Sequence, residues 1–219
     1  MSFDLDSARA ALAAFAAAMD AAGYRGRYWI TCGTLLGFRR EGNFLKHDGD
    51  IDFAMHIGDL DEAIVPALEK GGFRLIKTMG TRESGYAMTF FDGTTKADIF
   101  FHYPDDGGGT WHAVTRGRPQ VRYRFPPFDL APAEFRGVPV TIPSPPETFL
   151  SAVYGPDWAT PVRRWHYAYC PHNLQLVGDG AAMARYRVKR AIWEVKSRLR
   201  QVWRDAKRKR AEARAKEAA

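Results

Sequence analysis

Three aspartates at alternate positions, Asp48, Asp50 and Asp52, constrain this chain more than any other feature of its sequence. In an extended strand alternate side chains project from the same face, so the three carboxylates would crowd one surface. Like charges that close repel one another, and a bound divalent cation relieves the repulsion. A solvated acidic turn is the alternative interpretation, but Ile51 and Phe53 favour a strand that packs on a core. We therefore predict a Mg²⁺ or Mn²⁺ site on this strand.

A glycine-threonine pair upstream of the aspartates predicts a phosphate-binding turn. Gly33 and Thr34 follow the apolar run YWITC and open a helix, where free backbone N–H groups and a hydroxyl can face an anion. Arg39 and Arg40 lie later in the same helix, and guanidinium groups clamp phosphate oxygens. These four residues are therefore the candidate substrate-binding residues, the alternative being an ordinary turn followed by two exposed helix arginines.

Hydrophobic periodicity and turn residues predict one domain of mixed helices and strands. We expect helices at 4–22, from 33 onward, at 59–72, 146–155 and 181–217, and strands at 28–32, 50–55, 73–79, 86–91, 96–103 and 138–142. Pro66 should kink or shorten the helix at 59–72. Because three β-rich runs follow one another with only turns between them, the sheet should be largely antiparallel. The fold class is therefore α/β (α+β), with a catalytic domain over residues 1–180 and a basic helix over 181–219.

The composition suits an ordered protein in a reducing compartment. Hydrophobic residues make up 46% of the 219 positions, which is enough for a sizeable core. No apolar run reaches the roughly 18 residues that a transmembrane helix needs, and the first residues, MSFDLD, lack the layout of a signal peptide. Cys32 and Cys170 lack metal-ligand spacing, as do the six histidines. We therefore expect a cytoplasmic protein with two free thiols and no zinc site.

Positive charge is concentrated near the end of the sequence. The net charge is +7, but residues 185–219 alone hold 14 Lys or Arg against 4 Asp or Glu. Apolar residues recur there at three- and four-residue steps, with Trp193 and Trp203 beside them: Val188, Ile192, Val195, Leu199, Val202 and Ala206. Residues 186–210 are predicted either to lie on an anionic membrane or to pack this stripe onto the catalytic domain or a second subunit. Nucleic acid is the less favoured partner, because the first 184 residues carry a net charge of −3.

Three blocks of sequence resemble the signatures of the LicD and fukutin-related family. CGTLLGFRREGNFLKHDGDIDF (32–53) is similar to the family's Gly-Thr-Leu-Leu-Gly segment with its following arginine, here Arg40, and its acidic cluster. KADIFFHY (96–103) resembles the later strand that carries a third aspartate, here Asp98. IPSPPETFLSAVYGPDWATPV (142–162) resembles the C-terminal signature, and the blocks occur in the family's order.

Two positions depart from the family pattern. His47 stands in place of a tryptophan, which puts in doubt any stacking role of that position. Gly49 stands in place of the middle aspartate of the acidic cluster. In a regular strand Gly49 points away from Asp48 and Asp50, so this change need not remove a metal ligand.

The resemblance implies a nucleotidyltransferase fold and a metal-dependent phosphotransferase activity. The donor would be a CDP-linked alcohol such as CDP-choline or CDP-ribitol, the acceptor a glycan hydroxyl, and the leaving group CMP. Asp50, Asp52 and Asp98 would be the catalytic residues, and together with Asp48 they would hold Mg²⁺ or Mn²⁺. Asp98 would also accept the proton of the attacking hydroxyl, and Arg40 would bind phosphate.

Two other functions remain open at this point. The same carboxylates suit an enzyme in which an NTP is attacked at its α-phosphate and pyrophosphate leaves. A non-catalytic membrane or nucleic-acid adaptor is less favoured, because an adaptor has no need of converging carboxylates. A cluster after the last signature would either bind a nucleobase or sugar or pack into the core: Trp158, Arg163, Arg164, Trp165 and His166.

Overall fold

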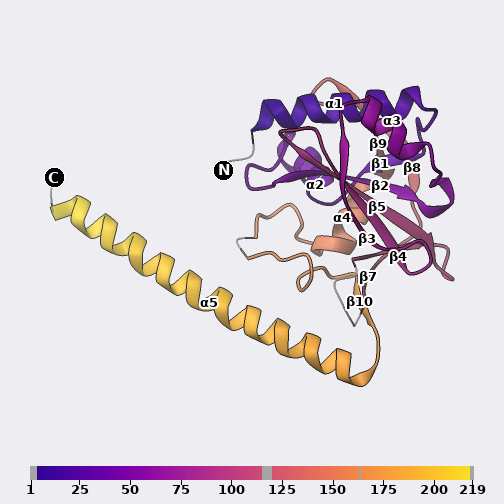
Figure 1. Ribbon diagram of the computed structural model, residues 1–219. Helices are drawn as coiled ribbons and strands as arrows, with labels where there is room; N and C mark the ends of the chain where they lie inside the picture. The colour runs from indigo at the N-terminus through magenta and orange to yellow at the C-terminus, as the bar shows by residue number, and fades with distance from the viewer. Residues whose placement is uncertain (1–3, 115–119, 163, 218–219) are drawn as a thin grey trace.

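The computed structural model describes residues 4–114, 120–162 and 164–217, and Figure 1 shows an α/β body from which one long helix extends. Among these residues, no helix is both long enough and apolar enough to cross a membrane. The helices are α1 (Leu5–Ala21), α2 (Cys32–Glu41), the short 3₁₀ helix η1 (Ile57–Asp59), α3 (Ile64–Lys70), α4 (Pro146–Tyr154) and α5 (Gly180–Glu217).

Eight strands form one sheet in the order β1-β2-β5-β6-β7-β10, with β4 also paired to β5 and β3 to β4, while β8 and β9 form a separate hairpin. Their bounds are β1 (Tyr28–Ile30), β2 (Asp50–His56), β3 (Arg74–Thr81), β4 (Gly85–Phe91), β5 (Lys96–Pro104), β6 (Thr110–Val114), β7 (Gln120–Phe125), β8 (Asp129–Phe135), β9 (Val138–Ser144) and β10 (Leu174–Val177). The pairing is antiparallel except between β2 and β5, which confirms the prediction of a largely antiparallel sheet. The parallel pair brings the amino-terminal ends of β2 and β5 to the same edge.

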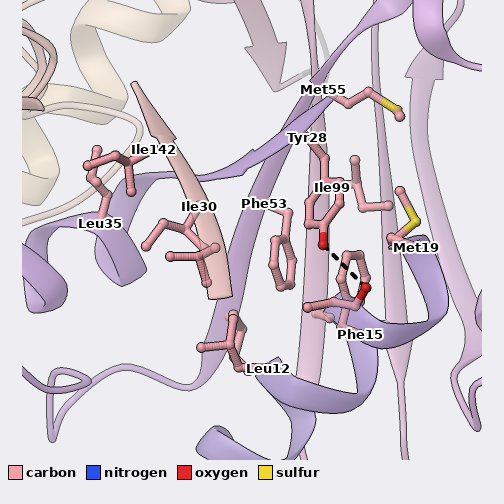
Figure 2. Close-up of a cluster of buried hydrophobic side chains, with 14 of the residues drawn as sticks. Leu12, Phe15, Met19, Tyr28, Ile30, Leu35, Phe53, Met55, Ile99 and Ile142 are labelled. Carbon is pink, nitrogen blue, oxygen red and sulfur yellow. Dashed lines mark hydrogen bonds between the residues drawn. The ribbon is translucent and has the colours of Figure 1, made fainter. Parts of the chain in front are cut away.

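The core lies between α1 and one face of the sheet (Figure 2). Leu12, Phe15 and Met19 recur at helical spacing along α1 and are fully buried. The ring of Phe15 stacks on that of Phe53 from β2, with 3.8 Å between centroids. The hydroxyl of Tyr28 donates to the Asp20 carboxylate at 3.0 Å, which satisfies this polar group at the edge of the layer.

Truncating this core should lower stability without touching the site described below. We expect Leu12→Ala to reduce the free energy of unfolding by about 3 kcal/mol, because the substitution leaves a cavity where neighbouring elements cannot fully close. Urea denaturation followed by circular dichroism measures the change. Ile76→Ala on β3, whose side chain is 43% exposed, is the control and should cost less than about 1 kcal/mol.

The other face of the sheet carries the aspartates at one end and a buried aromatic layer beyond them. Ile51 and Phe53 are buried in the α1 core, so Asp50 and Asp52 project from the opposite side. There the rings of Trp29 and His102 lie 5.1 Å apart, and α4 covers the layer. Burial holds the pKa of His102 well below its usual range, so this histidine is a neutral core residue.

One predicted helix is wrong in its extent. The sequence predicted a helix over residues 59–72 that Pro66 would kink or shorten, and α3 is shorter, because it begins only at Ile64 and ends at Lys70. The Asp61 carboxylate accepts the Ala63 N–H at 2.9 Å, and this turn replaces the expected first part of the helix. Pro66 therefore falls in the first turn of α3, where its missing N–H would have no helical partner, so no kink is needed.

Candidate active site

The three aspartates of the alternating motif meet at the amino-terminal end of β2. Asp50 and Asp52 belong to the strand, whereas Asp48 lies two residues before it, outside the strand that was expected to hold all three. One carboxylate oxygen from each residue lies within 4.8 Å of the other two. The crowding predicted from their spacing is therefore present.

Asp98 lies beside this group on the neighbouring strand. It is aligned with Asp52 in the parallel β2–β5 pair, and Thr89 of β4 lies opposite it on the other side. One oxygen of Asp98, Oδ1, is buried and has no hydrogen-bonding partner among the described residues. The tight oxygen group found there comprises Asp48, Asp50 and Asp52, so Asp98 borders that group.

The start of α2 holds Asp52 in place. The Gly33 N–H donates to Oδ2 of Asp52 at 2.9 Å, and the Asp52 N–H donates to Oγ1 of Thr34 at 2.8 Å. The chain turns sharply here, with Cys32 at a φ of 45°. The sequence predicted that backbone N–H groups at this turn would be free to bind an anion. For Gly33 this is corrected, because its N–H donates to the carboxylate of Asp52.

The position of Gly33 also leaves no room for a side chain. A Cβ at this position would lie 2.0 Å from Oδ2 of Asp48 and 3.2 Å from Oδ2 of Asp52. The carboxylates can therefore pack directly over the backbone only because the residue has no side chain.

The electrostatics of the group disfavour the ionisation of all its carboxylates together. Burial, together with the charge of Asp50, raises the pKa of Asp48 to about 7. Burial raises the pKa of Asp52 well above its usual range, and the charges of Asp50, Asp48 and Asp98 add to this. A hard divalent cation accepts carboxylate oxygens and removes the penalty of ionising them together. The donor set thus fits Mg²⁺ or Mn²⁺.

The two candidate arginines have different surroundings. Arg39 forms an ion pair with Glu147 at the start of α4, on the surface. Arg40 contacts Glu41 at 3.0 Å, but its side chain is only 15% exposed and its Nε is buried without a hydrogen-bonding partner among the described residues. The ion pair of Arg39 therefore connects α2 with α4. Arg40, in contrast, has an Nε–H group near the site that is available to donate a hydrogen bond.

Tyr154, at the end of α4, is a site residue to which sequence reasoning gave no role. Burial raises its pKa well above the usual range, the neighbouring Cys32, Asp52 and Asp48 raise it further, and Arg40 opposes them. A neutral phenol therefore lies near the acidic group. The available signal was the Tyr-Gly pair at the end of the helix within the 142–162 block. The ring of Trp165 packs on Tyr154 at 4.6 Å between centroids.

Other predicted residues are placed as follows. Trp158 packs against the hydrophobic core, and Arg163 lies outside the described residues. Burial raises the pKa of the Cys32 thiol well above its usual range, so this cysteine stays protonated beside the carboxylates.

Comparison with known proteins agrees with this geometry. Residues 25–145 match the model of the LicD/FKTN/FKRP nucleotidyltransferase domain, which is more than half of the chain. This chain belongs to the LicD/FKTN/FKRP family. The match contains both the α2 turn and all four aspartates.

Curated relatives of the family align over part of their length. A mouse protein named ribitol-5-phosphate transferase FKTN is 29% identical over 151 residues, and its counterpart from Macaca fascicularis is 30% identical. An uncharacterised Caenorhabditis elegans protein, T07A5.1, is 29% identical over 140 residues. The alignments cover 68% of this chain for the two FKTN proteins and 59% for T07A5.1, but the chain spans only about a third of these relatives' own length (32% and 37%).

Among solved structures, the lincosamide antibiotic adenylyltransferase LnuA with bound lincomycin aligns with a TM-score of 0.36 at 18% identity. That alignment covers 53% of this chain and 69% of LnuA.

Proposed function

We propose that this chain is a divalent-metal-dependent phosphotransferase that moves a phospho-alcohol from a CDP-linked donor to a carbohydrate hydroxyl and releases CMP. The observation that carries the proposal is the convergence of the Asp48, Asp50 and Asp52 oxygens within 4.8 Å of one another, with Asp98 in register beside them. The names of the FKTN relatives, ribitol-5-phosphate transferases, support an alditol phosphate as the transferred group.

Each residue of the site has a distinct task in this proposal. Asp48, Asp50 and Asp52 would hold Mg²⁺ or Mn²⁺, which supplies neutralising charge for the diphosphate of the donor. Gly33 and Thr34 keep Asp52 positioned before the donor binds, so little reorganisation is needed during transfer.

The acceptor and the donor phosphate need protein groups of their own. Burial raises the pKa of Asp98, which makes it a stronger base, and its unpartnered Oδ1 takes the proton of the attacking hydroxyl. Arg40 offers its guanidinium to the donor phosphate. Tyr154 remains neutral and provides a further hydrogen-bond donor at the same place.

A product assay tests the proposal. We expect the purified protein to release CMP from CDP-ribitol or CDP-choline when a carbohydrate acceptor is present, and to do so only with Mg²⁺ or Mn²⁺. EDTA should abolish the release and added Mg²⁺ should restore it, whereas Zn²⁺ should substitute poorly because all the expected ligands are oxygen atoms. Chromatography of the nucleotide products measures the outcome.

Two results would contradict the proposal. Pyrophosphate released from an NTP, with the CDP-alcohols inert, would assign the chain to the nucleotidylyltransferases instead. Full CMP release in EDTA would show that the aspartates act without a metal.

A further inference from the structure

The basic helix α5 carries two distinct faces. It begins after β10, where the Asp179 carboxylate accepts the Ala182 N–H at 2.7 Å, and it extends well beyond the body of the molecule (Figure 1). It accounts for the net positive charge of the chain, since residues 185–219 hold 14 Lys or Arg against 4 Asp or Glu, a net of +10, whereas the whole chain carries +7.

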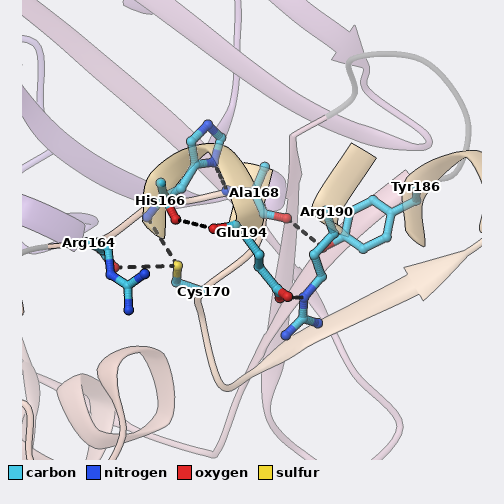
Figure 3. A network of polar contacts seen from close by, with 8 residues as sticks. Arg164, His166, Ala168, Cys170, Tyr186, Arg190 and Glu194 are labelled. Carbon is cyan, nitrogen blue, oxygen red and sulfur yellow. Dashed lines mark hydrogen bonds and ion pairs between the residues drawn. The ribbon is translucent and has the colours of Figure 1, made fainter. Parts of the chain in front are cut away.

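One face of α5 is docked on the segment that follows α4. The Tyr186 hydroxyl donates to the Ala168 carbonyl at 2.6 Å, and Figure 3 shows this contact beside the Arg190–Glu194 ion pair. The Trp193 ring lies 5.7 Å from that of His166. Ser197, one turn further, is 8% exposed. The rotation of the helix about its own axis is therefore set by the domain.

The apolar stripe lies on the opposite face. Val188, Val195 and Leu199 each follow a docked residue by two positions, which is about 200° around an α-helix. The side chains of the stripe are 48% to 67% exposed: Val188, Ile192, Val195, Leu199 and Val202. The alternative that this stripe packs onto the catalytic domain is therefore wrong.

Trp193 and Trp203 lie on different faces of α5. Trp193 contacts His166 and the ring of Tyr169, 5.6 Å away, so its predicted place beside the stripe is corrected. Trp203 does adjoin the stripe, with 64% of its surface exposed and Nζ of Lys207 5.4 Å from the ring centroid.

We propose that the stripe face of α5 lies on the surface of an anionic lipid bilayer. Lys189 and Lys196 each follow a stripe residue directly, and Arg198 directly precedes Leu199, so cations border the apolar face. Their long side chains reach the headgroup level while the stripe enters the acyl boundary, where an interfacial Trp203 is also favourable. Basic residues near such a surface contribute roughly 1 kcal/mol each.

The positive charge of α5 argues against a second copy of this chain as the partner of the stripe. The alternating four- and three-residue steps of the stripe also suit a coiled-coil seam. However, pairing two helices would bring together two segments that each carry 14 Lys or Arg against 4 Asp or Glu, and the positions beside the seam are mostly cationic. An anionic bilayer attracts the same charges. Nucleic acid would leave the apolar stripe in water.

Vesicle flotation of the full chain tests this inference. We expect binding to phosphatidylcholine vesicles that contain phosphatidylglycerol, much weaker binding at high salt, and little binding to pure phosphatidylcholine. Leu199→Gln with Val202→Gln should weaken binding about tenfold or more at unchanged charge. The matched control, Ile76→Gln with Val177→Gln, replaces exposed apolar residues elsewhere and should change binding less than about twofold.

A second measurement does not depend on the stripe variant folding. Brominated lipids should quench the fluorescence of the wild type more than that of Trp203→Phe.

Absence of binding to anionic vesicles, or an equal loss of binding in the control variant, would overturn the inference. A dimer in analytical ultracentrifugation that the stripe variant abolishes, without vesicle binding, would assign the face to a second copy. Asp52→Asn should bind vesicles like the wild type, so failure here and failure of the proposed phosphotransferase activity can be told apart.

Discussion

Replacing Asp52 with asparagine should lower kcat by roughly a thousandfold or more at saturating Mg²⁺. The substitution removes one negative charge from the oxygen group with little change in volume. The Asp52 N–H still donates to the Thr34 hydroxyl, and the Asp52 carbonyl still accepts from the Thr31 N–H. The fold should persist. The free energy of unfolding of the metal-free protein should stay equal or rise, because repulsion among the carboxylates falls. Asp50→Asn and Asp98→Asn should also lower kcat without lowering the free energy of unfolding.

Steady-state kinetics and urea denaturation measure the two effects separately. Asp59→Asn is the control, because Asp59 forms a surface ion pair with Arg27 outside the site, and its kcat should stay near that of the wild type. If any of the three site variants kept a kcat near that of the wild type, the proposed catalytic role of that residue would be wrong.

Gly33→Ala should weaken the apparent Mg²⁺ affinity by about ten- to a hundredfold while the protein still folds. The new Cβ would lie 2.0 Å from Oδ2 of Asp48, and the Asp48 side chain can rotate away at small cost to the fold. That rotation takes a carboxylate out of the group, so the metal site is damaged rather than the core. Titration of activity with Mg²⁺ and of the protein with Mn²⁺ by calorimetry both report the change.

Gly49→Ala is the matched control for this prediction. Gly49 lies between Asp48 and Asp50, and a Cβ there would have no neighbour within 4 Å. Its Mg²⁺ affinity should stay within about twofold of the wild type. Equal losses in both alanine variants would mean that backbone stiffening, and not contact with Asp48, explains the effect.

Local sequence patterns predicted the elements and the acidic group well. The helical spacing of Leu12, Phe15 and Met19 marked the buried face of α1, and alternation marked the shared face of Asp50 and Asp52. These patterns succeed because they depend on the geometry of neighbouring residues along the chain. The start of α3 was missed because a side-chain turn at Asp61 competes locally with the helix.

Some features of the site depended on contacts between distant segments. Asp98 lies beside the group because β5 pairs in parallel with β2, whereas the three consecutive β-rich runs predicted only that the sheet would be largely antiparallel. The Gly33 amide binds Asp52 instead of remaining free, since β1 pairs with β2 and leads directly into α2, which brings the start of α2 against β2. Tyr154 reaches the site from α4 by packing alone.

The sequence by itself determined which residues carry charge, which faces are apolar, and that Asp50 and Asp52 share one strand face. It also determined that α5 has an apolar stripe bordered by cations. Only the tertiary structure decided which way that stripe points, because contacts of Tyr186 and Trp193 with residues 166–169 set the rotation of the helix. A periodic pattern defines a face, but the partner of that face is chosen by packing between segments far apart in the chain.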